Sequence, residues 1–236
     1  MNENNYDARR AYYARRKKRR RKIIIRRIFA MLLIVGILAG GVYGGVRLYN
    51  WLKGGGAPQS SAGKSSKGLA DIEIPDWIDS QIIHKHNTAR TGTPLSGVKN
   101  IVIHYVGNPG TTAQNNRDYY DKSSTEVSSH FVVGLDGEII QCIPLDEKSS
   151  ASNWRNGDTI SIETCHPDET GKFNEATYNS VVKLTAWLLS KLGLDENAVI
   201  RHYDITGKLC PLYYVENEDK WEQLKRDVGS KINEYK

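Results

Sequence analysis

Three side chains between residues 104 and 210 are of the kinds that bind a metal ion together. The chain has six histidines and three cysteines. His202 and Cys210 lie in the segment RHYDITGKLCP, and His104 lies in the apolar segment NIVIHYV. Imidazole nitrogen and thiolate sulphur are good zinc ligands, and three protein ligands leave a fourth position open for a water whose pKa the metal lowers. The spacing alone does not establish a site, because a lone histidine in a strand is more commonly a hydrogen-bonded core residue.

The elements that must position these residues can be predicted from hydrophobic periodicity and turn chemistry. Short apolar runs predict strands, and the Asp136-Gly137 pair between two of them predicts a hairpin. Asn174 is expected to cap a helix that Gly193 ends, and Asn217 to cap a last helix with Trp221, Leu224, Val228 and Ile232 as its buried stripe. The predicted strands are 100–106, 129–135, 138–143 and 159–165, and the predicted helices are 111–122, 174–192 and a last one that begins at Asn217. This order predicts a mixed α/β fold, in which a central mixed β-sheet with a hairpin is flanked by helices.

Four segments together carry a resemblance to a known family. They read NIVIHYVGN, SSHFVVGLDGEIIQCIP, DTISIETCHP and RHYDITGKLCP, and they follow one another between residues 100 and 213. In this order they resemble the zinc N-acetylmuramoyl-L-alanine amidases, the family of the phage amidase-type lysozymes and the animal peptidoglycan recognition proteins. The resemblance implies a peptidoglycan recognition protein-like fold. It also implies hydrolysis of the amide bond between N-acetylmuramic acid and L-alanine, so the expected substrate is peptidoglycan.

The resemblance also implies roles for five residues. His104, His202 and Cys210 would bind one Zn²⁺ per chain. Lys208 matches the family's lysine, whose charge can stabilise the oxyanion of a tetrahedral intermediate. Glu163 matches a glutamate of several bacterial members and would move protons between water and the leaving amine. Strand alternation places Glu163 on the same face as Ser161 and Cys165. Lys208 could instead be a surface lysine in a loop, and Glu163 a strand glutamate that makes a structural hydrogen bond.

The chain departs from the phage-type pattern at one position. Phage-type members carry a tyrosine just before the His-Phe pair of the second strand, where this chain has Ser129 before His130 and Phe131. A tyrosine at this position therefore cannot contribute, and proton transfer is expected to rest on Glu163. His130 follows the family pattern without being one of its zinc ligands, and both a structural and a substrate-adjacent role stay open.

The other two cysteines, Cys142 and Cys165, leave two further alternatives open. An exported domain permits disulfides, so these cysteines could form one or remain as two buried thiols. Cys165 and His166 could also act as a nucleophile and its base. Adjacent residues of a strand point to opposite faces, which argues against direct cooperation of this pair.

The N-terminal quarter has a composition unlike that of the remainder. Residues 1–27 carry twelve basic and two acidic side chains, a net charge of +10, whereas the remaining residues carry 21 basic and 25 acidic ones, a net charge of −4. Residues 28–46 carry no charge and are nearly long enough to cross a hydrocarbon core. We therefore expect a basic cytoplasmic tail (1–27), a transmembrane helix (28–48), a flexible Gly/Ser-rich linker (49–71) and an amidase domain (72–236). A cleaved signal peptide is the alternative to this anchor.

The charge distribution predicts the partners and the location. A strongly basic flank stays in the cytoplasm, so the chain is expected to be a single-pass protein of the cell membrane with its catalytic domain extracellular. The basic pI comes from the tail alone, and this argues against nucleic acid as a partner. A binding module that holds peptidoglycan without cutting it, and an anchored cysteine peptidase or transpeptidase, are the competing functions. The first would be expected to lack a zinc ligand, whereas Cys210 is present.

Overall fold

The fold is built on one mixed β-sheet. The computed structural model describes residues 66–86 and 88–236. Within them lies a six-stranded sheet of order β1-β4-β3-β5-β2-β6. The strands are β1 (Asp79–Ser80), β2 (Asn100–Ile103), β3 (Phe131–Val133), β4 (Ile139–Gln141), β5 (Thr159–Thr164) and β6 (Val199–Arg201). The β3–β4 hairpin is antiparallel, and every other pair of neighbouring strands is parallel. The predicted mixed sheet with a hairpin is confirmed.

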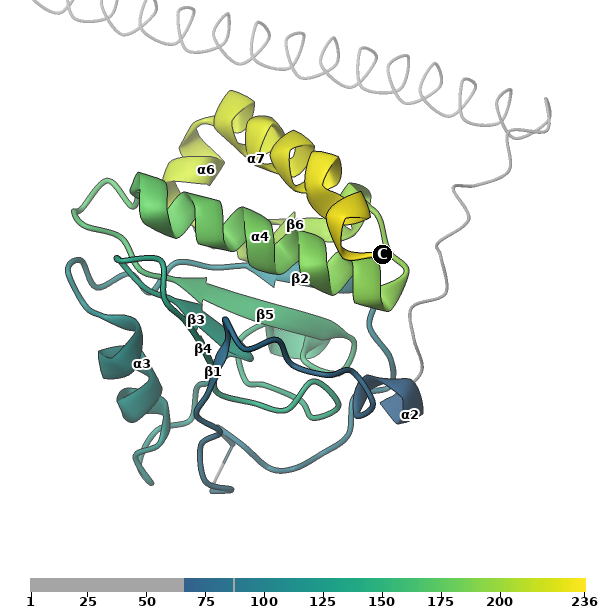
Figure 1. The fold of residues 1–236 in the computed structure, drawn as a ribbon. Coiled ribbons are helices and arrows are strands. Elements are labelled where there is room, and N and C mark those ends of the chain that lie inside the picture. Colours follow the sequence, from purple (N-terminus) through teal and green to yellow (C-terminus); the bar gives the residue numbers. More distant parts are fainter. Residues whose placement is uncertain (1–65, 87) are drawn as a thin grey trace, which may run out of the picture. The chain divides into compact units, whose positions relative to one another are not determined.

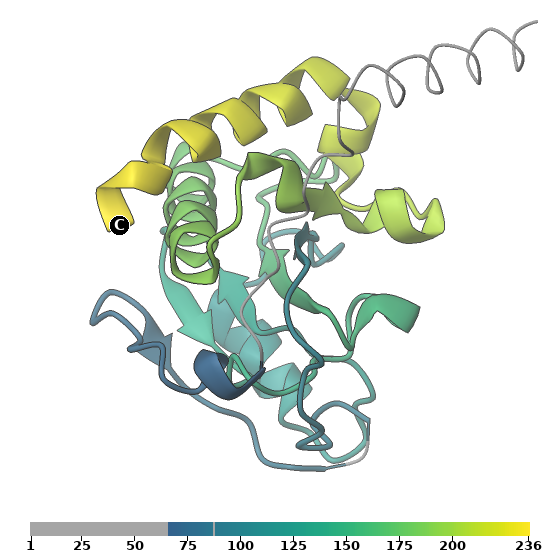
Figure 2. The same cartoon turned by 90° about the vertical axis from the view of Figure 1, so that its right-hand side faces the viewer.

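Helices cover both faces of this sheet (Figure 1). The long helices α4 (Glu175–Leu192) and α7 (Glu218–Lys231) pack on one face and on each other, as Figure 2 shows from the side. Helix α3 (Ala113–Tyr120) packs against β3 and β4 from the opposite face. The short helices are α2 (Ser66–Leu69), η1 (Asn153–Arg155), η2 (Glu196–Ala198), α5 (His202–Thr206), α6 (Leu212–Glu216) and η3 (Ile232–Tyr235).

The two faces of the sheet carry separate hydrophobic clusters. Ile103 and Ile162 belong to the larger cluster beneath α4 and α7, whereas Val132 and Cys165 belong to the smaller cluster on the α3 face. Because side chains alternate along a strand, His104 after Ile103 and Glu163 after Ile162 must face the α3 side. Burial of both faces explains why these strands read as apolar runs rather than as an alternation of apolar and polar residues.

The predicted turn and cap residues act as expected at three of four places. Gly137 adopts a φ of +83° in the hairpin, and Gly193 a φ of +68° after α4, conformations that side chains with a Cβ rarely adopt. The Asn174 side chain accepts a hydrogen bond from the Thr177 amide, as predicted. Asn217 is the N-cap residue of α7, as predicted, but its side chain makes no capping hydrogen bond to that helix. Its side-chain amide donates to the Tyr213 carbonyl of α6 instead.

The predictions for the N-terminal tail, the transmembrane helix and most of the linker fall on residues 1–65, outside the described part. Among the described residues, no helix is long and apolar enough to cross a membrane. Leu69 and Ile72 are both buried in the larger cluster, so the segment just before β1 belongs to the folded domain.

Candidate active site

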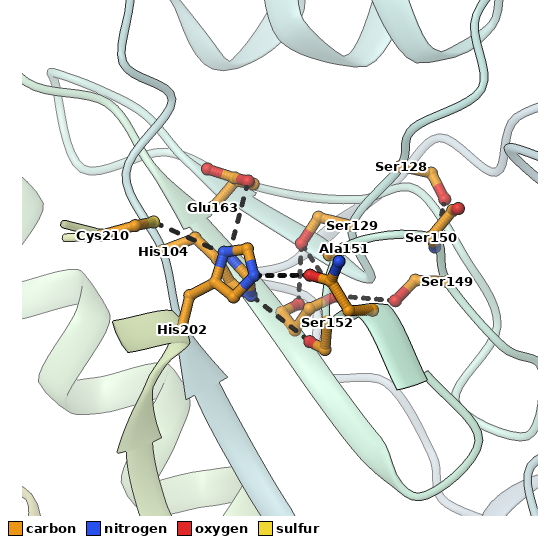
Figure 3. Close-up of polar contacts among 12 residues, drawn as sticks. His104, Ser128, Ser129, Ser149, Ser150, Ala151, Ser152, Glu163, His202 and Cys210 are labelled. Atoms are coloured by element: carbon orange, nitrogen blue, oxygen red, sulfur yellow. Dashed lines mark hydrogen bonds and ion pairs between the residues drawn. The ribbon is translucent and has the colours of Figure 1, made fainter. Parts of the chain in front are cut away.

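His104, His202 and Cys210 lie together at the carboxyl edge of the sheet (Figure 3). Their candidate ligand atoms all lie within 4.8 Å of one another, and all three residues are buried. The Nδ1 atom of His104 lies 3.8 Å from the sulphur of Cys210. The ring centroids of His104 and His202 are 4.7 Å apart. The structure thus brings together three residues that are up to 106 positions apart in the chain.

Strand order explains this meeting. β2 and β6 are parallel neighbours, so His104 directly after β2 and His202 directly after β6 leave the sheet side by side. The buried guanidinium of Arg201 donates to Asp204 and to the Tyr214 carbonyl and thereby fixes the start of α5. The Tyr203 amide donates to the Cys210 carbonyl at 3.0 Å, which returns the chain to the histidines after α5.

The loop of residues 149–157 orients the two imidazoles from the other side. The hydroxyl of Ser152 lies 3.4 Å from Nε2 of His104, and the amide oxygen of Asn153 lies 2.8 Å from Nε2 of His202. An amide oxygen only accepts, so Nε2 of His202 carries the proton and Nδ1 keeps its lone pair. Such partners set the tautomer of a metal-ligating histidine. Sequence reasoning missed Ser152 and Asn153, because they act through a contact that only the folded chain makes.

Glu163 stands beside this cluster on the neighbouring strand β5. Its Oε1 atom lies 3.9 Å from Nδ1 of His104. Its Oε2 atom is buried without a hydrogen-bond partner. Burial raises the pKa of this carboxyl from 4.5 to about 8, an effect that the positive charge of Lys208 opposes. A carboxyl with a free oxygen and a pKa near neutrality is suited to proton transfer.

These residues line one cavity of about 400 Å³, into which Lys208 also projects. Lys208 is exposed, and its charge reaches the whole cluster. Burial, the charge of His202 and the charge of Lys208 hold the pKa of His104 well below 6.5. Burial and Lys208 likewise lower the pKa of His202. Both imidazoles are therefore neutral near pH 7, the form in which histidine binds a metal ion.

The donor set fits zinc. Two neutral imidazoles and one thiol supply the nitrogen and sulphur ligands that zinc prefers, with a cavity on the open side. Burial and the nearby Glu163 together raise the pKa of Cys210 to about 12, an effect that the charge of Lys208 opposes. A thiol in this environment stays protonated unless a cation binds it, and a metal ion deprotonates a coordinating thiol.

The departure at Ser129 has a structural counterpart. Ser129 is buried, and its hydroxyl donates to the Ser161 carbonyl at 2.9 Å, so it does not face the cavity. Tyr120 from α3 lines the cavity instead. Its ring is almost fully buried, and burial together with the charge of Glu163 raises its pKa well above 10, so the phenol remains a proton donor. The sequence contained no local signal for Tyr120, which reaches the cavity from a different element.

The open question about His130 has a structural answer. The Ser161 amide donates to its Nδ1 at 3.0 Å, and its Nε2 then donates to the Glu147 carbonyl at 2.9 Å. Both ring nitrogens are used, and the ring is fully buried. His130 therefore has a structural role between β3 and β5, and it does not line the cavity.

The alternatives for Cys142 and Cys165 find no support in the geometry. Cys142 pairs with His130 on one side of β3, and Cys165 follows β5 on the other side, so a whole strand lies between them. Two strand spacings amount to about 9.5 Å, beyond the Cα separation that a disulfide tolerates. Cys165 is buried outside the cavity, burial raises its pKa to about 12, and the Nδ1 atom of His166 donates to the Asp168 carbonyl. The structure therefore offers no activated thiolate at Cys165.

Comparison with known families identifies the domain. The family described as N-acetylmuramoyl-L-alanine amidase matches residues 93–212, about half of the chain. The chain belongs to this amidase family. The matched residues include His104, Glu163, His202, Lys208 and Cys210. The family resemblance that the four sequence segments indicated is thereby confirmed.

Individual relatives of this amidase-family chain are bacterial. It is 33% identical over 165 residues to the N-acetylmuramoyl-L-alanine amidase BlyA of Bacillus subtilis, covering 61% of this chain and 44% of BlyA. It is 30% identical over 158 residues to the amidase CwlL of Bacillus licheniformis, covering 60% and 43%. The chain thus spans less than half the length of these curated relatives.

Solved structures resemble the same part of the amidase-family domain. A mutant endolysin from Bacillus subtilis superimposes with a TM-score of 0.57 at 27% identity, covering 64% of this chain and 98% of the endolysin chain. The catalytic domain of XlyA superimposes with a TM-score of 0.57 at 25% identity, covering 64% and 99%. The mixed α/β fold is therefore that of amidase domains.

Proposed function

We propose that this protein is a zinc-dependent amidase that hydrolyses the bond between N-acetylmuramic acid and L-alanine in peptidoglycan. One observation carries the proposal: the ligand atoms of His104, His202 and Cys210 lie within 4.8 Å of one another in a cavity that Glu163 and Lys208 also line. Membership of the amidase family and relatives that are named amidases support the substrate class.

The three ligands and their supports define what a metal ion would do here. Zn²⁺ held by His104, His202 and Cys210 would polarise the amide carbonyl and make a water acidic enough to attack it. Ser152 and Asn153 hold the two imidazoles at Nε2, so that each ring presents its other nitrogen to the cluster. The donor set leaves the cavity side open for the substrate.

Glu163 would transfer protons in this reaction, and Lys208 would stabilise the negative charge that develops. The unpartnered Oε2 of Glu163 can accept a proton from the attacking water and deliver it to the nitrogen of the leaving L-alanine. The charge of Lys208 can stabilise the negative oxygen that develops at the carbonyl carbon. Tyr120 lines the same cavity and keeps its hydroxyl protonated, because burial and the charge of Glu163 raise its pKa.

Purified cell wall incubated with the full-length protein tests the activity. We expect new amino-terminal L-alanine to appear, and to disappear when a chelator is added. Metal analysis should find one zinc per chain, which is lost in Cys210→Ser. Protein that binds the wall and holds zinc but releases no L-alanine would favour the binding-only alternative instead. Full activity in metal-free protein would exclude the zinc mechanism.

We further propose that the amidase domain is held outside the cell by a single-pass anchor. The uncharged residues 28–46 and the +10 charge of residues 1–27 support this location. Membrane fractionation of the full chain and of a chain that starts after residue 48 tests it. We expect only the full chain to sediment with membranes, and protease added to intact protoplasts to remove the domain. A full chain found in the soluble fraction would contradict the anchor.

A further inference from the structure

The large apolar side chains that remain exposed gather around the catalytic cavity. Among the described residues these are Tyr119, Val127, Trp154, Tyr203 and Leu209. Val127 lines the cavity itself, and each of the others is adjacent in sequence to a residue that does. Trp154 is the largest and has 73% of its surface exposed. A soluble surface rarely leaves such groups together without a binding partner.

Trp154 is displayed on a rigid turn. It lies in the short helix η1, between Asn153 and Asn156. The Asn156 side chain accepts hydrogen bonds from the amides of Ala151 and Ser152, and the Asn156 amide donates to the Asn153 carbonyl. These hydrogen bonds fix the backbone that carries Trp154, and its exposed indole is available to pack on a ligand.

The same turn is tied to the metal-binding cluster. Asn153 has a φ of +53°, a conformation that costs energy for a residue with a Cβ. Its side chain bonds His202 at 2.8 Å. This contact ties the turn that carries Trp154 to the metal-binding cluster. A sugar ring bound by the indole would therefore lie at a fixed position relative to the bond that is cut.

The acidic and basic side chains that line the cavity are Glu163 and Lys208, and both lie outside loop 149–157. The loop 149–157, SSASNWRNG, contains a single charged residue, Arg155, whose guanidinium is engaged by Asp158 at 2.7 Å and Asn100 at 2.7 Å. The loop thus presents hydroxyls, amides and one exposed indole. A sugar ring has a matching surface, because its hydroxyls form hydrogen bonds and its C–H face packs on an aromatic ring.

We propose that Trp154 is a subsite for the glycan strand, on which a pyranose ring of the substrate stacks beside the scissile bond. The inference rests on the proposed function, because it places the sugar side of the amide over loop 149–157. The stem peptide then leaves toward the charged side at Lys208. A lipid surface or the peptide itself would be the occupant if the assays below respond to those ligands instead.

Binding of a peptide-free oligosaccharide of alternating N-acetylglucosamine and N-acetylmuramic acid tests the subsite without any hydrolysis. We expect Trp154→Ala in the full-length protein to bind this glycan about tenfold more weakly, measured as a higher dissociation constant in calorimetry. Trp154→Phe should retain most of the affinity. Tyr235→Ala, which removes an aromatic side chain that does not line this cavity, should bind as the wild type does. Unchanged thermal midpoints would show that all three variants fold.

Two results would overturn the subsite. One is equal glycan affinity in the wild type and in Trp154→Ala. The other is a Trp154→Ala defect confined to a free stem peptide or to anionic vesicles. Hydrolysis of purified wall separates this proposal from the amidase proposal. If the protein binds glycan through Trp154 but releases no L-alanine, only the amidase proposal is refuted. If the protein is active and Trp154→Ala has the same KM as the wild type, only the subsite proposal is refuted.

Discussion

His104 and His130 lie on the same face of the sheet, on opposite sides of strand β5. His104 stands beside Glu163, and His130 stands beside Ser161, two residues earlier on that strand. Both rings are buried, and burial lowers the pKa of both. Their surroundings differ in one respect. Backbone groups occupy both nitrogens of His130, whereas Nδ1 of His104 faces Cys210 and Glu163 across an open cavity.

This difference shows that burial by itself does not distinguish a ligand from a core residue. A histidine becomes a candidate ligand when one nitrogen is held by a partner and the other is left facing further donors. The same contrast extends to β5, because Ser161 is fully engaged in hydrogen bonds with Ser149 and His130 whereas an oxygen of Glu163 has no partner. Four predictions test the contrast.

Replacing each histidine gives the largest expected difference. We expect His104→Ala to lose its zinc and to reduce the turnover of purified wall by at least about a thousandfold, because the ligand set is broken. His130→Ala should keep one zinc per chain but lose about 1–3 kcal/mol of stability, because it leaves the Ser161 amide and the Glu147 carbonyl unpaired. Metal analysis and denaturant unfolding measure both effects. Loss of zinc from a folded His130→Ala variant would contradict the assignment of His104 as a ligand and His130 as a structural residue.

The two β5 residues beside the histidines form the second pair. Glu163→Gln keeps the shape of the side chain but removes its ability to take a proton, so kcat should fall about 10²- to 10⁴-fold with zinc retained. Ser161→Ala should leave kcat within about twofold and cost about 1 kcal/mol of stability. Single-turnover assays on muramyl peptide at matched zinc content check this. An active Glu163→Gln would assign proton transfer to another group.

The pH dependence of stability is the third test. Folding lowers the pKa of His130 from 6.5 to about 4, so the unfolded chain binds the proton more tightly. The contribution of His130 is therefore fully present above pH 6.5 and is lost as the pH falls toward 4, a change of about 3 kcal/mol. His130→Gln should show a correspondingly shallower loss of stability over this range. Unfolding of both chains in chelator, between pH 4 and 7, measures the difference; parallel curves would show that His130 does not titrate.

The support of His202 by Asn153 gives the smallest expected effect. Asn153→Ala removes the acceptor from Nε2 of His202 without touching a ligand, and zinc affinity should fall about 10- to 100-fold. Asn153→Asp, which keeps an acceptor oxygen, should restore most of it. Competition with a chelator of known affinity measures both, and equal affinity in the wild type and in Asn153→Ala would show that the loop does not orient the ring.

The sequence by itself predicted the family, the three longest helices and four of the six strands that the described residues form, but it missed β1 and β6. The Asp136-Gly137 turn, the Asn174 cap and the Gly193 stop are local, because each depends on a few neighbouring residues and their backbone preferences. The four motifs also named His104, Glu163, His202, Lys208 and Cys210, the residues that line one cavity.

Tertiary structure alone decided which side chains meet across the sheet. Strand order separates Cys142 from Cys165 by the width of β3, so sequence distance could not show whether they pair. Packing brings Tyr120 to the cavity that Ser129 does not reach, and it sets the Asn153 turn against His202. Such contacts join residues far apart in the chain, and their geometry depends on the whole sheet rather than on any local pattern.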